Sequence, residues 1–174
     1  MDCWGVLQMM IVSLTTISLF LVGYGLQGMM STARSSVSKP FLSFVEFQKD
    51  GLGRVEGLNG VWSVTLSPDG KHVYAAGYRD DAVTVFSRDA TTGRLTFVEV
   101  QKGGAGGVDG LSGALSVIVS PDGKHVYTGA YWDEAVSVFG RDEVTGRLAF
   151  LDLEKEGVGG VEGLNGVRCV TASQ

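Results

Sequence analysis

Beyond residue 40 the chain alternates apolar and polar residues in short runs, a pattern that predicts β-strands. The runs in the first half are Val61–Leu66, His72–Ala76, Ala82–Phe86 and Leu95–Val100, all rich in β-branched and aromatic residues. The dipeptide Asp69-Gly70 between the first two runs favours a hairpin, since glycine tolerates a positive φ. No apolar spacing of 3.6 residues occurs here, so this region is predicted to be all-β.

The same pattern repeats along the chain with a period of 53 residues. Ser67-Pro68-Asp69-Gly70-Lys71-His72-Val73-Tyr74 returns at 120–127, and Thr92-Gly93-Arg94 returns at 145–147. Residues 42–94 and 95–147 are identical at 33 of 53 aligned positions, and a third copy, 148–174, runs about half-way. A fixed period of this length is typical of repeat architectures.

Four short antiparallel strands per repeat are typical of a β-propeller blade. The sequence therefore predicts an all-β fold, with about two and a half propeller blades across residues 41–174. The innermost strand of each blade is expected at Val61–Ser67 and Ala114–Ser120, and the outermost at Leu95–Gln101 and Leu148–Glu154. One more outer strand, Phe41–Gln48, and one more inner strand, Val167–Thr171, are expected at the two ends.

The N-terminal residues 1–33 follow a different pattern, because no charged residue occurs between Cys3 and Ala33. The span from Trp4 to Gln27 is long enough to cross a bilayer as one apolar helix. The alternative is a cleaved signal peptide ending at small residues near Ala33. Residues 34–40 would then be a linker, and the protein is expected to be membrane-anchored or secreted.

Composition excludes some partners. The net charge of −5 and the pI near 5.0 provide no basic stripe for phosphates, so nucleic acid is not an expected partner. Glycine is abundant at 26 residues and proline scarce at 3, which fits many tight turns. Two cysteines form neither a disulfide framework nor a CxxC metal site.

The repeats resemble the lactonase-type seven-bladed propellers, which include 6-phosphogluconolactonase-like proteins. The resemblance lies in residues 64–74 (Val-Thr-Leu-Ser-Pro-Asp-Gly-Lys-His-Val-Tyr), 82–89 (Ala-Val-Thr-Val-Phe-Ser-Arg-Asp) and 92–96 (Thr-Gly-Arg-Leu-Thr). These residues form the strands and turns of a blade, so the resemblance implies the fold more strongly than the activity. No catalytic motif of the family falls on a matching position, and no catalytic residue is predicted.

This copy of the propeller is incomplete, because a closed ring needs at least four blades. An open arc would expose apolar faces that repeats normally bury against each other. Two explanations stay open: the natural protein is longer, or chains self-associate to complete a ring.

Candidate ligand-binding residues are expected on one rim of the propeller. This rim contains the loops that connect the second strand of a blade with the third, and the loops that connect the fourth strand with the first strand of the next blade. That rim should also contain the long loops 50–60 and 103–113. Trp132 is the strongest candidate, since an exposed aromatic side chain anchors ligands well. The competing interpretation is that the rim carboxylates are solvated turn residues that cap strand ends. The candidates are Arg79, Asp80, Asp81, Trp132, Asp133 and Glu134.

The remaining motifs predict no chemistry. The loops beginning at Gly51, Gly104 and Gly157 have displaced third glycines and no following helix, so they are not dinucleotide sites. No cofactor and no metal site is predicted, with Ca²⁺ at the glycine loops as a minor alternative. His72 and His125 are repeat residues and are expected to be structural.

The expected function is a membrane-anchored or exported propeller that binds a protein or small-molecule ligand at its rim, without chemistry of its own. The alternative is a fragment of a lactonase-like hydrolase, in which a rim carboxylate or arginine activates water or holds the lactone. A third alternative is a gene fragment without a folded product.

Overall fold

The computed structural model describes residues 43–173, and these contain no helix. The predicted apolar helix within residues 1–33 and the linker 34–40 lie outside the described residues, so both stay predictions. Among residues 43–173 there is accordingly no helix that could cross a membrane.

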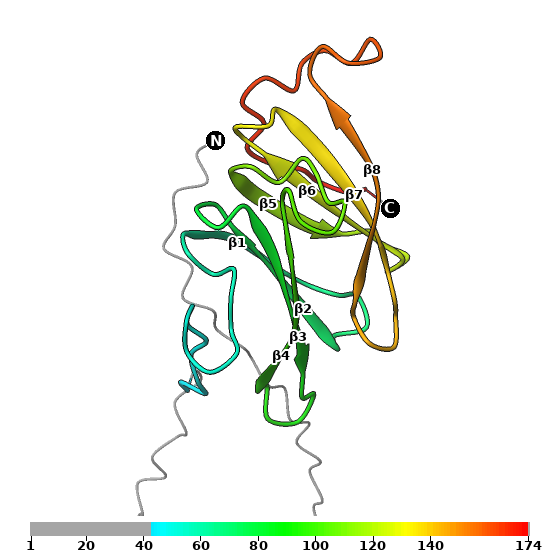
Figure 1. The fold of residues 1–174 in the computed structure, drawn as a ribbon. Coiled ribbons are helices and arrows are strands. Elements are labelled where there is room, and N and C mark those ends of the chain that lie inside the picture. Colours follow the sequence, from blue (N-terminus) through cyan, green and yellow to red (C-terminus); the bar gives the residue numbers. More distant parts are fainter. Residues whose placement is uncertain (1–42, 174) are drawn as a thin grey trace, which may run out of the picture. The chain divides into compact units, whose positions relative to one another are not determined.

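The described chain forms two four-stranded antiparallel sheets (Figure 1), one for each complete repeat. In both sheets each strand pairs with the next along the sequence, which is the order of a propeller blade. Blade 1 consists of β1 (Val61–Leu66), β2 (His72–Gly77), β3 (Ala82–Arg88) and β4 (Leu95–Lys102). Blade 2 consists of β5 (Ala114–Val119), β6 (His125–Ala130), β7 (Ala135–Arg141) and β8 (Leu148–Lys155).

The first hairpin turn of each blade is held by an aspartate. In blade 1, Asp69 accepts hydrogen bonds from the hydroxyl of Ser67 and from the backbone N–H of Lys71. Gly70 has a φ of 71°, the left-handed conformation that favours glycine. Asp122 makes the same contacts in blade 2. The recurring Ser-Pro-Asp-Gly-Lys segment is therefore one turn structure used twice.

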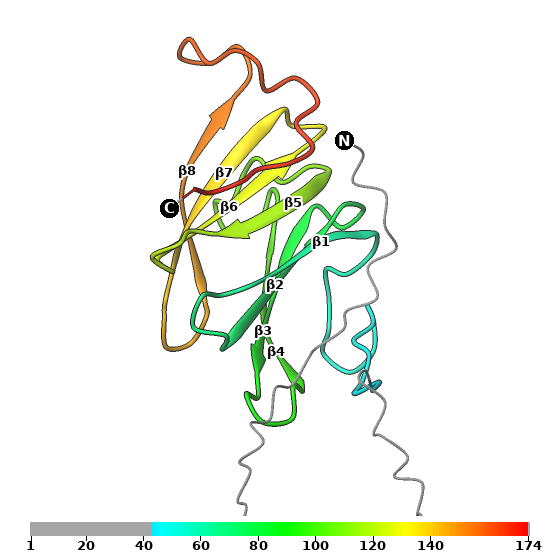
Figure 2. The ribbon, with the colours of Figure 1, turned by 180° about the vertical axis from the view of Figure 1, so that it is seen from behind.

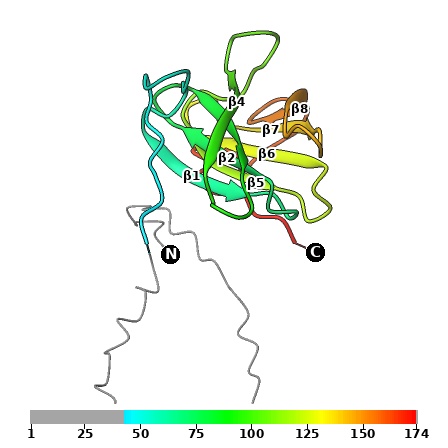
Figure 3. The same cartoon turned by 90° about the horizontal axis from the view of Figure 1, so that it is seen from below.

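The main hydrophobic core lies between the two blades, which pack side by side when viewed from below (Figure 3). Blade 1 contributes β2 and β3 side chains, and blade 2 contributes the loop before β5 as well as β5 to β8. The fully buried members include Tyr74, Val83, Val85, Leu111, Val126 and Phe139. Burial between repeats is what a propeller requires, because each blade shields the next from water.

Two of the predicted strands are wrong. Ser43–Gln48, the described part of the expected outer strand, is not a strand, and neither is Val167–Thr171 at the other end. In a complete blade these segments would pair with a third and a second strand, respectively. The described residues provide no such neighbour, so their backbones have no ladder to join.

Both segments nevertheless occupy the positions that the repeat assigns to them. Glu46 accepts a hydrogen bond from the N–H of Leu95, as Glu99 does from Leu148 one repeat later. At the other end, the N–H of Val170 donates to the hydroxyl of Ser116. The C-terminal segment, red in Figure 2, accordingly crosses blade 2 on one side. Contacts between neighbouring repeats thus persist where pairing within a blade is incomplete.

Candidate functional site

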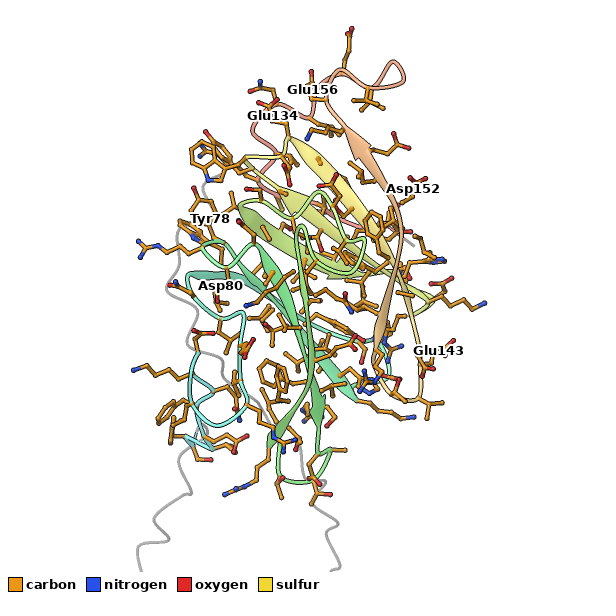
Figure 4. The ribbon with its side chains drawn as sticks, in the orientation of Figure 1. Tyr78, Asp80, Glu134, Glu143, Asp152 and Glu156 are labelled. Carbon is orange, nitrogen blue, oxygen red and sulfur yellow. The ribbon has the colours of Figure 1, made fainter. Side chains whose placement is uncertain are left out.

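The predicted rim exists, and Figure 4 shows Tyr78, Asp80, Glu134 and Glu156 along it. It contains the loops that connect β2 with β3 and β6 with β7, together with the long loops that precede β1 and β5. The two sets of loops are tied together by backbone hydrogen bonds: Tyr78 N–H donates to Gly60 O, and Tyr131 N–H to Gly113 O.

Three of the six candidate residues hold these loops in place. Asp80 accepts a hydrogen bond from the N–H of Asn59 at 3.0 Å, and Asp133 accepts one from Ser112 at 2.7 Å. Asp81 reaches across to blade 2, where it accepts one from the N–H of Gly113 at 2.7 Å. For these aspartates the geometry supports the capping interpretation, since each satisfies a backbone donor that strand pairing leaves free.

Glu134 differs from its repeat equivalent, Asp81. Both have a positive φ, 51° and 52°, so the backbone places them alike. Within residues 43–173, however, the Glu134 carboxylate accepts no hydrogen bond within 3.5 Å, and it is only partly buried. It is therefore a rim carboxylate that is available to a ligand or a water molecule.

Four aromatic rings form a continuous row along the rim. Tyr78 lies 6.4 Å, centroid to centroid, from both Trp62 and Trp132, and Trp132 lies 4.7 Å from Tyr131. The two tryptophans stay 56% and 63% exposed, so their rings stabilise one another while presenting apolar surface to solvent. We call Trp62, Tyr78, Tyr131 and Trp132 the aromatic row.

Of this row, sequence reasoning offered only Trp132 as a ligand-binding candidate. Trp62 differs from the residues at the equivalent positions of the other repeats, which are Leu115 and Arg168. Tyr78 and Tyr131 occupy the same repeat position, directly after the second strand, and this was a signal for a common site. Two arginines lie near the row: exposed Arg79 next to Tyr78 in sequence, and Arg168, whose guanidinium carbon lies 5.5 Å from the ring centroid of Tyr131.

A second polar cluster lies away from the rim, between the blades. Arg141 of blade 2 donates its Nε hydrogen to the Tyr74 hydroxyl at 2.8 Å and pairs with Asp69 at 3.0 Å. It also lies 2.9 Å from Nδ1 of His72, which is 3% exposed. We call Asp69, His72, Tyr74 and Arg141 the inter-blade cluster.

The inter-blade cluster is structural. Burial, assisted by the charge of Arg141, lowers the pKa of His72, so that its ring is neutral at pH 7 and accepts from the guanidinium. Burial raises the pKa of the Tyr74 hydroxyl, which donates to Gly146 O at 3.0 Å. Each buried polar group thus has a partner, as the structural interpretation of His72 anticipated.

The cluster predicts a loss of stability in acid. Partial burial by itself raises the pKa of Asp69, but hydrogen bonds from Ser67, Lys71 and Arg141 outweigh it and hold the pKa well below 3.8. The folded state therefore gains stability above the ordinary aspartate pKa, and that gain is lost as the pH falls below it.

We expect Asp69→Asn to flatten the acid limb of a stability profile measured by urea unfolding between about pH 5 and pH 2. Asp122→Asn is the matched comparison and should flatten the limb less, since the same turn hydrogen bonds also lower the pKa of Asp122 but no arginine of the described residues pairs with it. An acid limb that is equally steep in Asp69→Asn and in the unmodified protein would contradict this prediction.

Among residues 43–173, no three histidine, cysteine, aspartate or glutamate side chains gather closely enough to hold a metal ion. Binding of Ca²⁺ by the glycine loops stays an untested alternative.

The fold and its repeats define the class of protein. The model of the lactonase family with a seven-bladed β-propeller matches residues 64–159, more than half of the chain. The chain therefore belongs to this family, as the resemblance of its repeats indicated.

Solved structures agree with this membership. A Bacteroides uniformis protein with a provisional assignment as a 6-phosphogluconolactonase is 28% identical, with a TM-score of 0.50 over 60% of this chain and 29% of that one. The periplasmic gluconolactonase of Pseudomonas aeruginosa is 25% identical, with a TM-score of 0.50 over 60% and 28%. A Lactobacillus plantarum protein, 22% identical with a TM-score of 0.54 over 66% and 32%, shares the fold.

The chain spans between 28% and 32% of the length of these three structures. Among proteins of curated function, none matches it significantly.

Proposed function

We propose that this chain supplies part of the substrate-binding rim of a lactonase-type propeller that acts on a sugar lactone. The observation that carries the proposal is the aromatic row on the loop rim of a lactonase-family fold. The similar structures from Bacteroides uniformis and Pseudomonas aeruginosa are named as a 6-phosphogluconolactonase and a gluconolactonase, respectively. This supports the hydrolase alternative over a binding module without chemistry.

The row suits the flat, partly apolar face of a sugar ring. Trp62 and Trp132 are more than half exposed and are held in place by Tyr78 between them, so little side-chain entropy is lost on binding. Aromatic side chains combine a large contact area with few rotatable bonds, which is why they anchor ligands. Arg79 and Arg168 would donate hydrogen bonds to the oxygens of the sugar.

Hydrolysis would use the free rim carboxylate. In our proposal the Glu134 carboxylate removes a proton from a water molecule as its oxygen attacks the lactone carbonyl. The carbon–oxygen bond of the ring then breaks, the ring oxygen takes up a proton, and the product is the open-chain acid. An arginine of the rim would stabilise the negative charge that develops on the carbonyl oxygen.

Trp132→Ala tests the binding part. We expect the affinity for glucono-δ-lactone, measured by calorimetry with fresh substrate, to fall by about tenfold or more, because truncation removes an anchor ring. Leu151→Ala is the control, since Leu151 is also more than half exposed, at 56% against 63% for Trp132, but lies on the outer strand β8. Equal affinities for the two variants, or no saturable binding by the unmodified chain, would contradict the proposal.

Glu134→Gln tests the chemical part. It should abolish hydrolysis above the spontaneous rate while leaving lactone affinity within about twofold, because the amide keeps the size but not the basicity of the carboxylate.

Location at a membrane or outside the cytoplasm stays a prediction that depends on residues 1–33.

A further inference from the structure

Three sets of polar contacts across the interface between the two blades define the faces that meet there, and the first and the third of them recur one repeat away. The Ser63 hydroxyl of blade 1 accepts from Val117 N–H at 3.2 Å, and Arg141 enters the inter-blade cluster. At the outer edge, Glu99 accepts from Leu148 N–H at 2.7 Å and pairs with Arg147 at 2.9 Å. Blade 1 thus offers an acidic acceptor face, which we call the rear face, and blade 2 offers a basic front face.

The rear face of blade 2 repeats these acceptors. Its equivalents of Asp69, His72, Tyr74 and Glu99 are Asp122, His125, Tyr127 and Asp152. Tyr127 and His125 are only partly buried, whereas Tyr74 and His72 are 0% and 3% exposed. Within the described part of the chain, no arginine or lysine pairs with Asp122 or Asp152 within 4.0 Å.

A hollow on this rear face marks the missing contact. It has a volume of about 370 Å³ and is lined by Ile118, Pro121, Tyr127 and Val136, beside residues 170–173. These side chains correspond to Thr65, Pro68, Tyr74 and Val83 of blade 1, on the side that blade 2 covers. The hollow therefore lies where a further blade would pack.

The front face of blade 1 carries the matching donors. Arg88 is the equivalent of Arg141 and already donates to Gly70 O, as Arg141 does to Gly123 O. Within residues 43–173 it has no ion pair within 4.0 Å. The innermost strand of blade 1 also exposes apolar surface, since Val61 and Leu66 of β1 are 39% and 46% exposed, whereas Ala114, the equivalent of Val61, is completely buried.

We propose that the front face of blade 1 in one copy of this chain docks on the rear face of blade 2 in a second copy. In this head-to-tail contact, Arg88 lies beside Asp122, His125 and Tyr127 of the second copy. It thus takes the position that Arg141 takes beside the other three members of the inter-blade cluster. Arg94 pairs with Asp152, as Arg147 pairs with Glu99. The occupant is a second copy because one chain presents both halves of a contact whose geometry blade 1 and blade 2 display.

Two terminal segments must give way for this docking. Residues 43–48 lie at the outer edge of the front face, and residues 167–173 lie on the rear face. Neither belongs to a sheet, so the incoming blade replaces a few hydrogen bonds and not a ladder. It also replaces the ion pair between Arg94 and Glu46, which are 3.9 Å apart, so that Asp152 of the second copy takes the place of Glu46. Because the contact is heterologous, each dimer keeps one free face of each kind and can extend toward a ring.

Complementary variants test the contact. We would measure the mass of the full chain by analytical ultracentrifugation in mild detergent, which keeps the apolar N-terminal residues soluble. The unmodified chain should form dimers or larger assemblies of its 18.4 kDa unit. Arg88→Glu on the front face and Asp152→Arg on the rear face should each raise the dissociation constant by about tenfold or more.

The 1:1 mixture of the two variants is decisive. It should form a dimer that does not grow, because only one intact pair of faces remains in the mixture. Arg54→Glu and Glu143→Arg are charge-matched controls on exposed loops and should assemble as the unmodified chain does. Arg94→Glu and Asp122→Asn repeat the test if either first variant fails to give a cooperative thermal transition.

Three outcomes would overturn the proposal. The first is an unmodified chain that stays monomeric up to about 100 µM, weaker than the affinities typical of specific contacts. The second is assembly that both face variants leave unchanged, as association through the N-terminal segment or with a different partner would produce. The third is a mixture of the variants that fails to dimerise. None of these bears on lactone binding, which the Trp132 variant tests separately.

Discussion

Arg141→Ala is expected to lower the free energy of unfolding by about 3 kcal/mol, because it removes one partner from a buried charged network. The Arg141 side chain is 1% exposed and makes hydrogen bonds with Tyr74, His72, Asp69 and Gly123. Its loss leaves the Nδ1 acceptor of His72 and one lone pair of the Tyr74 hydroxyl buried without a donor. The Asp69 side chain is 31% exposed and can regain water, which keeps the cost near the lower end for buried pairs.

Arg88→Ala is the matched control for this prediction. Arg88 occupies the same repeat position and makes the equivalent hydrogen bond to Gly70, but it has no neighbouring cluster within the described residues. Its truncation should cost less than about 1 kcal/mol, as partly exposed arginines usually do. The measurement is urea unfolding of both variants at a concentration where the chain is monomeric. Equal costs at the two positions would show that the inter-blade cluster does not stabilise the fold.

Gly110→Ala is expected to cost about 2 to 3 kcal/mol, for two reasons that act together. Gly110 has a φ of 73°, which an L side chain adopts only with strain of about 1 kcal/mol. A Cβ atom here would also lie 2.5 Å from the Ser137 hydroxyl oxygen, which is fully buried and donates to Gly110 O at 2.8 Å. Relieving that overlap must move β7 or break the hydrogen bond.

Gly163→Ala separates the two contributions. Gly163 is the equivalent residue one repeat later, with a φ of 94°, but a Cβ atom there meets no atom within 4 Å. Only the backbone strain remains, so the cost should be about 1 kcal/mol. Thermal unfolding of the two variants under the same conditions gives the comparison. A Gly110 variant no less stable than the Gly163 variant would contradict the close packing of this loop on β7.

Most of the fold could be predicted because each blade is encoded locally. Asp69-Gly70 and Asp122-Gly123 are turn signals whose effect depends on neighbouring residues only, so the first hairpins were placed correctly. The six strands for which ranges were predicted, β1 to β5 and β8, agree with those ranges within two residues at their ends. The two predicted strands that did not form, the first in its described part 43–48 and the second at 167–171, have no strand of their own blade beside them within the described residues. Alternation identifies a strand-forming segment, but a ladder requires a neighbour.

The candidate site was predicted less well, because its members come together only in three dimensions. The repeat loops suggested a rim of carboxylates, yet Asp80, Asp81 and Asp133 hold backbone amides. Trp62 lies 70 residues before Trp132, and only the packing of both rings against Tyr78, in the loop after β2, makes them members of one row. Glu134 became distinctive when its equivalent, Asp81, proved to be engaged across the blades.

The sequence by itself determined the repeat length, the all-β class, the turn structures and the family, since these depend on local alternation and on short motifs that recur every 53 residues. Only the tertiary structure decided which polar side chains are buried and hydrogen-bonded within the fold and which stay exposed to solvent. His72 and His125 are identical in their local sequence, and Arg88 and Arg141 are nearly so, yet one of each pair is buried in a charged network and the other is not. The physical reason is that burial and hydrogen-bond partners come from the neighbouring blade, which no single repeat specifies.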